Sequence, residues 1–138
     1  MAQQNDSTQV LDGKITRADI ENFNWFKENY VQYKPAMSVV NELSEFKKCS
    51  LLVVLGTWCS DSHELVPQLF KVMDLAGWDN VELIAVDEKK QSKSVDVKPL
   101  NIEYVPIIIL FNDKHIVGKI VETTATTIEE DLLMLLKK

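Results

Sequence analysis

A cysteine stands at the point where an apolar run gives way to a helical pattern. Residues 51–55 (LLVVL) have the length and composition of a buried strand, Gly56 and Thr57 interrupt the run, and an amphipathic helical pattern follows Cys59. Backbone N–H groups at the start of a helix are unpaired and carry partial positive charge, which stabilises a thiolate. We therefore predict that Cys59 is a nucleophile, with an inert leftover thiol as the alternative.

The sequence offers no second thiol within reach of Cys59. Ser62 has a hydroxyl that can hydrogen-bond to the Cys59 sulfur but cannot attack a disulfide at neutral pH. Cys49 lies before the predicted strand, whose length of about six residues separates the two cysteines by roughly 20 Å, whereas a disulfide needs Cα atoms within ~7 Å. We expect Cys49 to be structural, and we assign any catalytic role to Cys59 and Ser62.

Two charged or titratable neighbours of the cysteine each have two interpretations. Asp61 is either a first-turn acid favoured by the helix dipole or a group that handles protons or contacts a partner, and its charge opposes a thiolate. His63 shares a helix face with Cys59, and we favour a solvated surface histidine over a proton partner. Two cysteines and two histidines lack a zinc-ligand spacing, and no glycine-rich phosphate loop or G-x-S-x-G motif is present, so we predict neither a metal nor a cofactor.

These residues also resemble a known family. Residues 58–62 (WCSDS) resemble the thioredoxin active-site motif W-C-x-x-C, with serine in place of the second cysteine. Pro67 stands where thioredoxins carry the proline that kinks the active-site helix, and residues 104–106 (YVP) resemble the cis-proline segment that faces the cysteine. The resemblance covers residues 48–138 and implies a thioredoxin-like fold.

The motif is most similar to a thioredoxin-like subgroup with C-x-D-S, whose pattern Cys59, Asp61 and Ser62 match one for one. The resemblance implies a cis bond before Pro106, and implies that Val105 offers backbone groups to an extended substrate by strand addition. Trp58 and Ser60 complete the motif and the substrate groove, with Trp58 serving both packing and docking. Thioredoxins carry a buried acid six residues before the cysteine, where this chain has Val53. That departure agrees with the missing resolving cysteine and argues against general disulfide reductase activity.

The residues before the motif predict a tail and two helices. Residues 1–14 are polar and lack periodicity, which predicts a flexible tail. Thr16 with Asp19 resembles a helix cap, an apolar helical pattern runs to Tyr30, and residues 33–35 interrupt it. Pro35 then opens a second helix. We expect residues 15–47 to pack on the sheet as a structural layer, with a substrate or partner surface as the alternative.

The residues after the motif predict the remaining elements of one domain. Gly77 ends the active-site helix, a strand covers residues 81–86, and residues 88–101 hold a short irregular helix. Strands 106–111 and 116–121 form a hairpin, and Thr126 with Glu129 forms a capping box before the helix 128–136. The predicted fold is a single α/β thioredoxin-like domain over residues 15–138, with a core at 48–138 and a central mixed β-sheet flanked by helices.

Composition restricts the partners. The chain has 138 residues and a formal net charge of −6, which argues against a nucleic-acid surface, and no apolar run approaches the ~18 residues of a membrane span. The first ten residues lack a signal-peptide pattern, so we expect a cytoplasmic protein. The alternative is a periplasmic or exported protein, because residues 2–4 also fit a mature end after an added Met1, and the C-x-D-S subgroup includes exported bacterial members.

Two functions follow from these residues. The first is a thioredoxin-like redox protein with one active-site cysteine, a monothiol thiol–disulfide oxidoreductase that acts through mixed disulfides in cell redox homeostasis. Its partners are protein or small-molecule thiols and disulfides, and an external thiol completes each turnover. The alternative is a redox-inactive module that binds peptide in the groove between Trp58 and the Val105–Pro106 segment. The oligomeric state does not follow from the sequence.

Overall fold

The structure is a computed structural model that describes residues 10–138. Five β-strands, five α-helices and one short 3₁₀ helix (η1) make up the described part of the chain. In chain order they are β1 (Gly13–Ile15), α1 (Arg17–Ile20), α2 (Asn24–Gln32), α3 (Met37–Leu43), β2 (Cys49–Leu55), α4 (Ser60–Ala76), β3 (Val81–Ala85), η1 (Lys98–Leu100), β4 (Ile107–Asn112), β5 (His115–Val121) and α5 (Ile128–Leu136).

The strands form one mixed sheet in the order β1-β3-β2-β4-β5. The central strand β2 runs parallel to β3 and antiparallel to β4, with Val53 level with Leu83 on one side and with Ile108 on the other. A parallel pair needs a crossover connection, and α4 supplies it between β2 and β3. The sheet thereby places the start of α4 next to the carboxyl end of the central strand.

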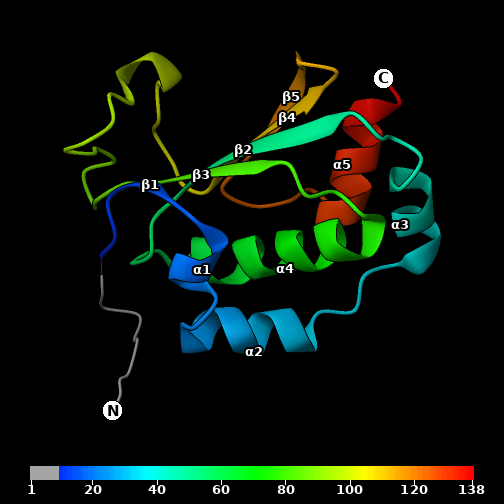
Figure 1. Cartoon of the computed structure of the whole chain (residues 1–138), viewed down its shortest axis with the longest axis horizontal. Coiled ribbons are helices and arrows are strands. Elements are labelled where there is room, and N and C mark those ends of the chain that lie inside the picture. Colours follow the sequence, from blue (N-terminus) through cyan, green and yellow to red (C-terminus); the bar gives the residue numbers. More distant parts are fainter. Residues whose placement is uncertain (1–9) are drawn as a thin grey trace.

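Two hydrophobic clusters cover the two faces of the sheet. The larger one joins all five α-helices to the face that carries Leu51, Val53 and Leu83. The smaller one covers the face of Val54 and Ile84, and no residue of an α-helix takes part in it. Its cover comes from the segment 87–106, the yellow-green loop that lies on the opposite side of the sheet from α4 and α2 (Figure 1). The expected mixed sheet flanked by helices is confirmed, and the α-helices lie on one of its faces.

The front of the chain differs from its predicted outline. Residues 10–12 precede strand β1, which pairs with β3 from Gly13 to Ile15, so the predicted tail of residues 1–14 ends inside the sheet. The remainder of that tail, residues 1–9, lies outside the described residues. A strand of three residues is too short to show periodicity, which is why the sequence did not reveal it.

Residues 15–47 were expected to form two helices, and the structure has three there, α1, α2 and α3. Thr16 begins the short helix α1 through a capping box with Asp19, and a second helix, α2, starts only after Phe23. Phe23 is 1% exposed, so the chain turns there to bury the ring. Helix α3 begins at Met37 with Ala36 as its cap, two residues later than the predicted start at Pro35.

The end of the chain follows the prediction with one correction. The β4–β5 hairpin turns at Asp113 and Lys114, both of which have positive φ. Helix α5 has the predicted bounds, but its cap is Thr127, whose side chain accepts the Glu130 N–H, and not Thr126. Glu129, the predicted capping partner, is instead buried against the front of the chain.

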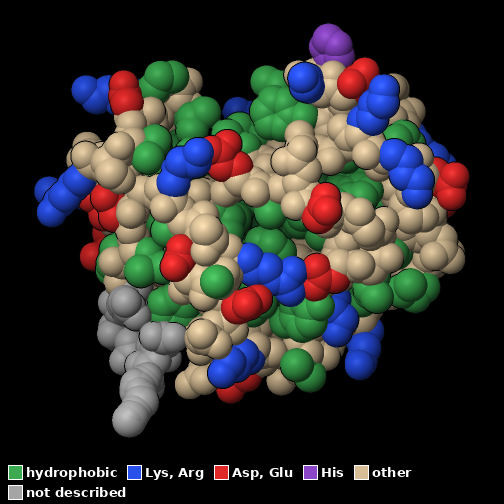
Figure 2. Space-filling model, in the orientation of Figure 1, with side chains coloured by type: hydrophobic (Ala, Val, Ile, Leu, Met, Phe, Trp, Pro, Cys, Tyr) green, Lys and Arg blue, Asp and Glu red, His purple; other side chains and the backbone are tan. Residues whose placement is uncertain are grey.

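The surface carries charges of both signs. Figure 2 shows Lys and Arg side chains interspersed with Asp and Glu over one face of the molecule, without a large patch of either sign. Within residues 10–138, every helix is too short or too polar to cross a membrane.

Candidate functional site

Cys59 caps the helix that the sequence predicted to follow it. The residue has extended backbone angles (φ −97°, ψ 124°), and α4 begins immediately after it at Ser60. Its carbonyl accepts the His63 N–H at 3.0 Å, which is the first bond of the helix. The side chain is partly exposed. The thiol therefore stands at the positive end of the 17-residue helix α4 and remains open to a reactant.

The cysteine faces the predicted proline segment. The Val105–Pro106 peptide bond is cis, and the Cys59 thiol donates to the Val105 carbonyl with a sulfur–oxygen distance of 3.5 Å. Val105 is 4% exposed, whereas the ring of the preceding Tyr104 is about half exposed. The two segments are 46 residues apart in the sequence, and the sheet brings them together because they follow β2 and precede β4, which pair directly.

Side chains of α4 hold the loop that leads into the cysteine. Ser62 is fully buried, and its Oγ accepts the Gly56 N–H at 3.2 Å. The His63 Nε2–H donates to the Thr57 carbonyl at 2.6 Å, since a carbonyl can only accept. Gly56 and Thr57, two consecutive loop residues, are thus hydrogen-bonded to the first turn of α4. The sequence-based expectation was a Ser62 hydrogen bond to the sulfur of Cys59, and the structure directs that hydroxyl to Gly56 instead.

The same loop is also held from outside the helix. The Thr57 side chain, which is fully buried, accepts the Leu11 N–H at 3.0 Å. The Trp58 indole donates to the Val86 carbonyl at 2.8 Å, which fixes the ring over Gly56. A Cβ on Gly56 would lie 2.5 Å from the indole ring, so this close approach requires glycine. Contacts from the front of the chain and from the end of β3 therefore fix the motif.

An aromatic contact at the site was not anticipated. The Trp25 ring of α2 stacks on His63, with ring centroids 4.5 Å apart and an interplanar angle of 16°. Trp25 is 7% exposed and His63 is partly buried, so the histidine is not the solvated surface group that the sequence suggested. The segment 15–47, predicted as a structural layer, therefore contacts the motif region through the stack of Trp25 on His63.

The remaining motif residues lie at the first turn of α4. Ser60 is exposed and Asp61 is partly buried. Among residues 10–138, the Asp61 carboxylate has no hydrogen-bond or ion-pair partner. Its position at the helix start agrees with a first-turn acid and leaves the carboxylate free to contact a partner.

Cys49 lies at the other end of β2 and is 6% exposed. Burial raises the pKa of the Cys49 thiol to about 11. Both cysteines are free thiols, and the length of β2 separates them by roughly 20 Å. Within residues 10–138, no three His, Cys, Asp or Glu side chains are grouped in a way that could hold a metal ion.

Comparisons with known proteins address the fold. No family model matches the chain, and no curated protein matches it in sequence. A protein of unknown function from Pseudomonas aeruginosa has a similar structure, with 17% identity and a TM-score of 0.53 over 82% of this chain and 68% of that chain.

Two thioredoxins are also among the similar solved structures. Mitochondrial thioredoxin 3 from Saccharomyces cerevisiae is 18% identical, with a TM-score of 0.44 over 79% of this chain and 97% of that chain. Thioredoxin O2 from Arabidopsis thaliana is 17% identical, with a TM-score of 0.46 over 73% of this chain and 83% of that chain. At such identities the likeness concerns the fold alone. The mixed sheet, its crossover helix and the hairpin that follows give this chain an α/β thioredoxin-like fold.

Proposed function

We propose that this protein is a single-cysteine thiol redox protein that acts through mixed disulfides formed by Cys59. The observation that carries the proposal is the position of this thiol. It is partly exposed at the start of α4, and its sulfur lies 3.5 Å from the carbonyl that precedes Pro106. A nucleophilic sulfur beside an extended backbone segment is suited to a disulfide held in line with that segment.

The chemistry of the proposal is limited to one sulfur. The Cys59 thiolate attacks one sulfur of a client disulfide, a Cys59–client bond forms, and the other client sulfur leaves as a thiolate. Ser62 cannot complete the exchange, because its hydroxyl is not a sulfur nucleophile and is already bonded to Gly56. Cys49 is buried at the far end of the strand. An external thiol must therefore release the client.

Selective alkylation tests the reactivity of the two cysteines. With iodoacetamide at about pH 7, we expect Cys59 to be modified in the folded protein and Cys49 only after unfolding, because Cys49 is 6% exposed and its pKa is about 11. Peptide mass mapping with and without urea measures both rates. Equal rates for the two cysteines in the folded protein would contradict this expectation.

The rate of the same reaction separates the proposal from its alternative. The rate constant of Cys59 at about pH 7 is compared with that of a cysteine in an unstructured peptide. We expect Cys59 to react several-fold faster, because its partly exposed thiol lies at the start of α4. A rate constant equal to the peptide's favours the redox-inactive peptide-binding module. Retained peptide binding by Cys59→Ser would then support that module.

A restored second thiol tests the placement of the motif. Residues three apart at a helix start are side-chain neighbours, and their Cα atoms are about 5–6 Å apart, within the Cα separation of ~4.4–6.8 Å that a disulfide spans. We expect Ser62→Cys to reduce a model disulfide with dithiothreitol at least about tenfold faster than the parent chain, because an internal thiol then releases the client. Ser60→Cys is the matched control, because its side chain is exposed and adjacent to Cys59 in sequence. No gain in Ser62→Cys, with folding intact by urea titration, argues against the motif.

A further inference from the structure

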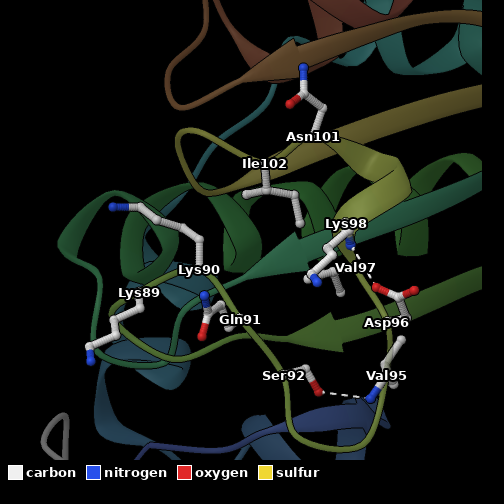
Figure 3. A pocket seen from close by; sticks show the side chains of 10 residues that line it. All are labelled: Lys89, Lys90, Gln91, Ser92, Val95, Asp96, Val97, Lys98, Asn101 and Ile102. Atoms are coloured by element: carbon white, nitrogen blue, oxygen red, sulfur yellow. Dashed lines mark hydrogen bonds between the residues drawn. The ribbon is translucent and has the colours of Figure 1, made fainter.

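A cavity lies beside the motif, within the segment that connects β3 to β4. Its volume is about 510 Å³, which falls in the range of ~300–1,000 Å³ typical of small-molecule sites. Figure 3 shows Lys89 and Lys90 on one side and Lys98 on the other, with Ile102 between them. The segment follows the carboxyl end of β3, as the Cys59 loop follows that of the parallel strand β2, and such ends are where open α/β sheets bind ligands.

The floor of the cavity is continuous with the packing around the thiol. Val97 lines the cavity and belongs to the buried cluster against which Trp58 and Cys59 pack. Val95 and Ile102 also line the cavity and pack against the same cluster. At the rim, the Lys90 ammonium lies 5.8 Å from the centroid of the Trp58 ring. The cavity and the thiol therefore border the same apolar cluster.

The cavity is cationic in a chain that is anionic as a whole. The lining holds three lysines and one acid, Asp96, so its formal charge is +2. Asp96 accepts the Lys98 N–H at 3.1 Å, and the nearby Asp87 accepts two backbone N–H groups, at 2.9 and 3.1 Å; these bonds orient the carboxylates and leave their charges in place. The ammonium groups of Lys89, Lys90 and Lys98 form no ion pair with any residue in 10–138. The lining is therefore net positive in a chain whose formal net charge is −6, which favours an anionic ligand at this place.

We propose that the cavity binds a low-molecular-weight thiol that carries carboxylate groups, and that this thiol is the external reductant for Cys59. This proposal rests on the proposed function, and it identifies the external thiol that the proposed function requires. The carboxylates of the thiol contact the lysines, its hydrocarbon part lies on Val95 and Ile102, and its sulfur reaches the Cys59–client disulfide. The volume of the cavity suits a small molecule rather than a folded partner.

Two molecules of the thiol complete one turnover. The first thiolate attacks the Cys59 sulfur, the Cys59–client bond breaks, and its electron pair leaves with the client sulfur as a thiolate. A second thiolate attacks the sulfur now joined to Cys59, which forms the disulfide of the small thiol and frees the Cys59 thiolate. The client disulfide is reduced by two electrons, and two thiols are oxidised to one disulfide.

Thiolysis of a model mixed disulfide tests the charge preference. The full chain carries 2-thiopyridine on Cys59, and the release of thiopyridone is timed with mercaptosuccinate, which is anionic, and with 2-mercaptoethanol, which is neutral. The quantity compared is the rate constant with mercaptosuccinate divided by the rate constant with 2-mercaptoethanol. We expect Lys89→Gln/Lys90→Gln/Lys98→Gln to lower this ratio about tenfold, because three positive charges near the reacting sulfur are lost. The ratio for the parent chain should also fall as salt is raised.

A variant with the same change in charge is the matched control. Lys34→Gln/Lys47→Gln/Lys114→Gln removes three exposed lysines that lie outside the cavity lining and outside the ion pairs of residues 10–138. We expect the control to change the ratio of rate constants less than about twofold. An equal fall in both variants would assign the effect to net charge and overturn the cavity as a binding site. An unchanged ratio in the first variant would overturn it also.

A binding measurement without Cys59 separates this proposal from the proposed function. Cys59→Ser protein is titrated with the S-methyl derivative of mercaptosuccinate, which cannot react, and backbone amide shifts are followed by NMR. We expect saturable shifts within residues 89–102, weakened at least about fivefold by the three cavity substitutions and not by the control. If Cys59 proves unreactive while these shifts occur, the cavity stands and the redox function fails. Absent or scattered shifts overturn the cavity.

Discussion

Single side chains decide what the motif can do. Ser62 occupies the place of a resolving thiol, yet it is buried and bonded to the Gly56 N–H. His63 donates to the Thr57 carbonyl and stacks on Trp25. Both residues therefore hold the loop that precedes Cys59, rather than contact its sulfur. We infer that the position of the Cys59 thiol depends on the hydrogen bonds that Ser62 and His63 form with this loop.

The role of His63 is testable against the other histidine of the chain. His63→Ala removes a hydrogen bond worth ~1 kcal/mol and a ring stack worth ~1 kcal/mol, so we expect the free energy of unfolding to fall by about 2 kcal/mol. His115→Ala is the matched control, because His115 is exposed at the start of β5. Urea titration measures both. Equal losses in the two variants would contradict a bracing role for His63.

Helices α1 and α2 are joined to α4 by a polar cluster on the surface. Asp74 of α4 accepts hydrogen bonds from both terminal nitrogens of Arg17, at 2.7 and 2.9 Å, and from the Tyr30 hydroxyl at 2.5 Å. Burial acts to raise the pKa of Asp74, but the hydrogen bonds from Arg17 and Tyr30 outweigh it and hold the pKa below its ordinary value of 3.8. The cluster fixes the helical layer that carries Trp25 to the motif.

This cluster predicts a pH dependence of stability. Because the folded-state pKa of Asp74 is depressed, its stabilisation is complete above the unfolded pKa of ~4 and is lost as pH falls through the folded pKa. We expect Asp74→Asn to cost about 1 kcal/mol near neutral pH, since partial exposure screens the pair, and the difference from the parent chain to vanish toward about pH 2.

Urea titrations over that pH range measure the difference. Asp79→Asn, an exposed acid beyond the end of α4, is the control, and we expect it to show no such trend. A difference between Asp74→Asn and the parent chain that stays constant with pH would contradict the pKa argument.

At the scale of the molecule, one buried carboxylate joins the front of the chain to its last helix. Glu129 of α5 is 2% exposed, and it accepts hydrogen bonds from the Tyr33 hydroxyl and from the Ala36 N–H, the latter at 2.8 Å. Burial and the bond to Glu129 raise the pKa of the Tyr33 hydroxyl, which stays protonated as a donor. The connection from α2 to α3 is thereby held against the end of the domain.

Removal of one hydroxyl tests this connection. We expect Tyr33→Phe to lower the free energy of unfolding by about 1–3 kcal/mol, because one Glu129 oxygen is left buried without its donor. Tyr104→Phe is the control: its ring is 54% exposed, and surface substitutions usually change stability by less than about 0.5 kcal/mol. Denaturant titration measures both. A loss in Tyr33→Phe no larger than in the control would show that the contact adds nothing.

The elements of the domain were largely predictable, and their interior contacts were not. The strand before Cys59, the hairpin turn and the bounds of α5 follow from local residue patterns, and the structure has all three. The cap of α5 was placed one residue early, because Thr126 and Thr127 are equivalent as local signals. In the structure the Thr126 hydroxyl donates to Asp131 at 2.8 Å, and Glu129 is buried against Tyr33, so these two residues form no capping box with each other.

That a thiol follows a buried strand and begins a helix can be read from the residues alone, because strand and helix periodicities are local and the break between them falls at Cys59. The surroundings of that thiol depend on how the chain folds. The contact of Cys59 with the Val105 carbonyl and the stack of Trp25 on His63 join residues far apart in the chain. Strand pairing and burial, which act over the whole sheet, bring those residues together, and no short stretch of sequence encodes them.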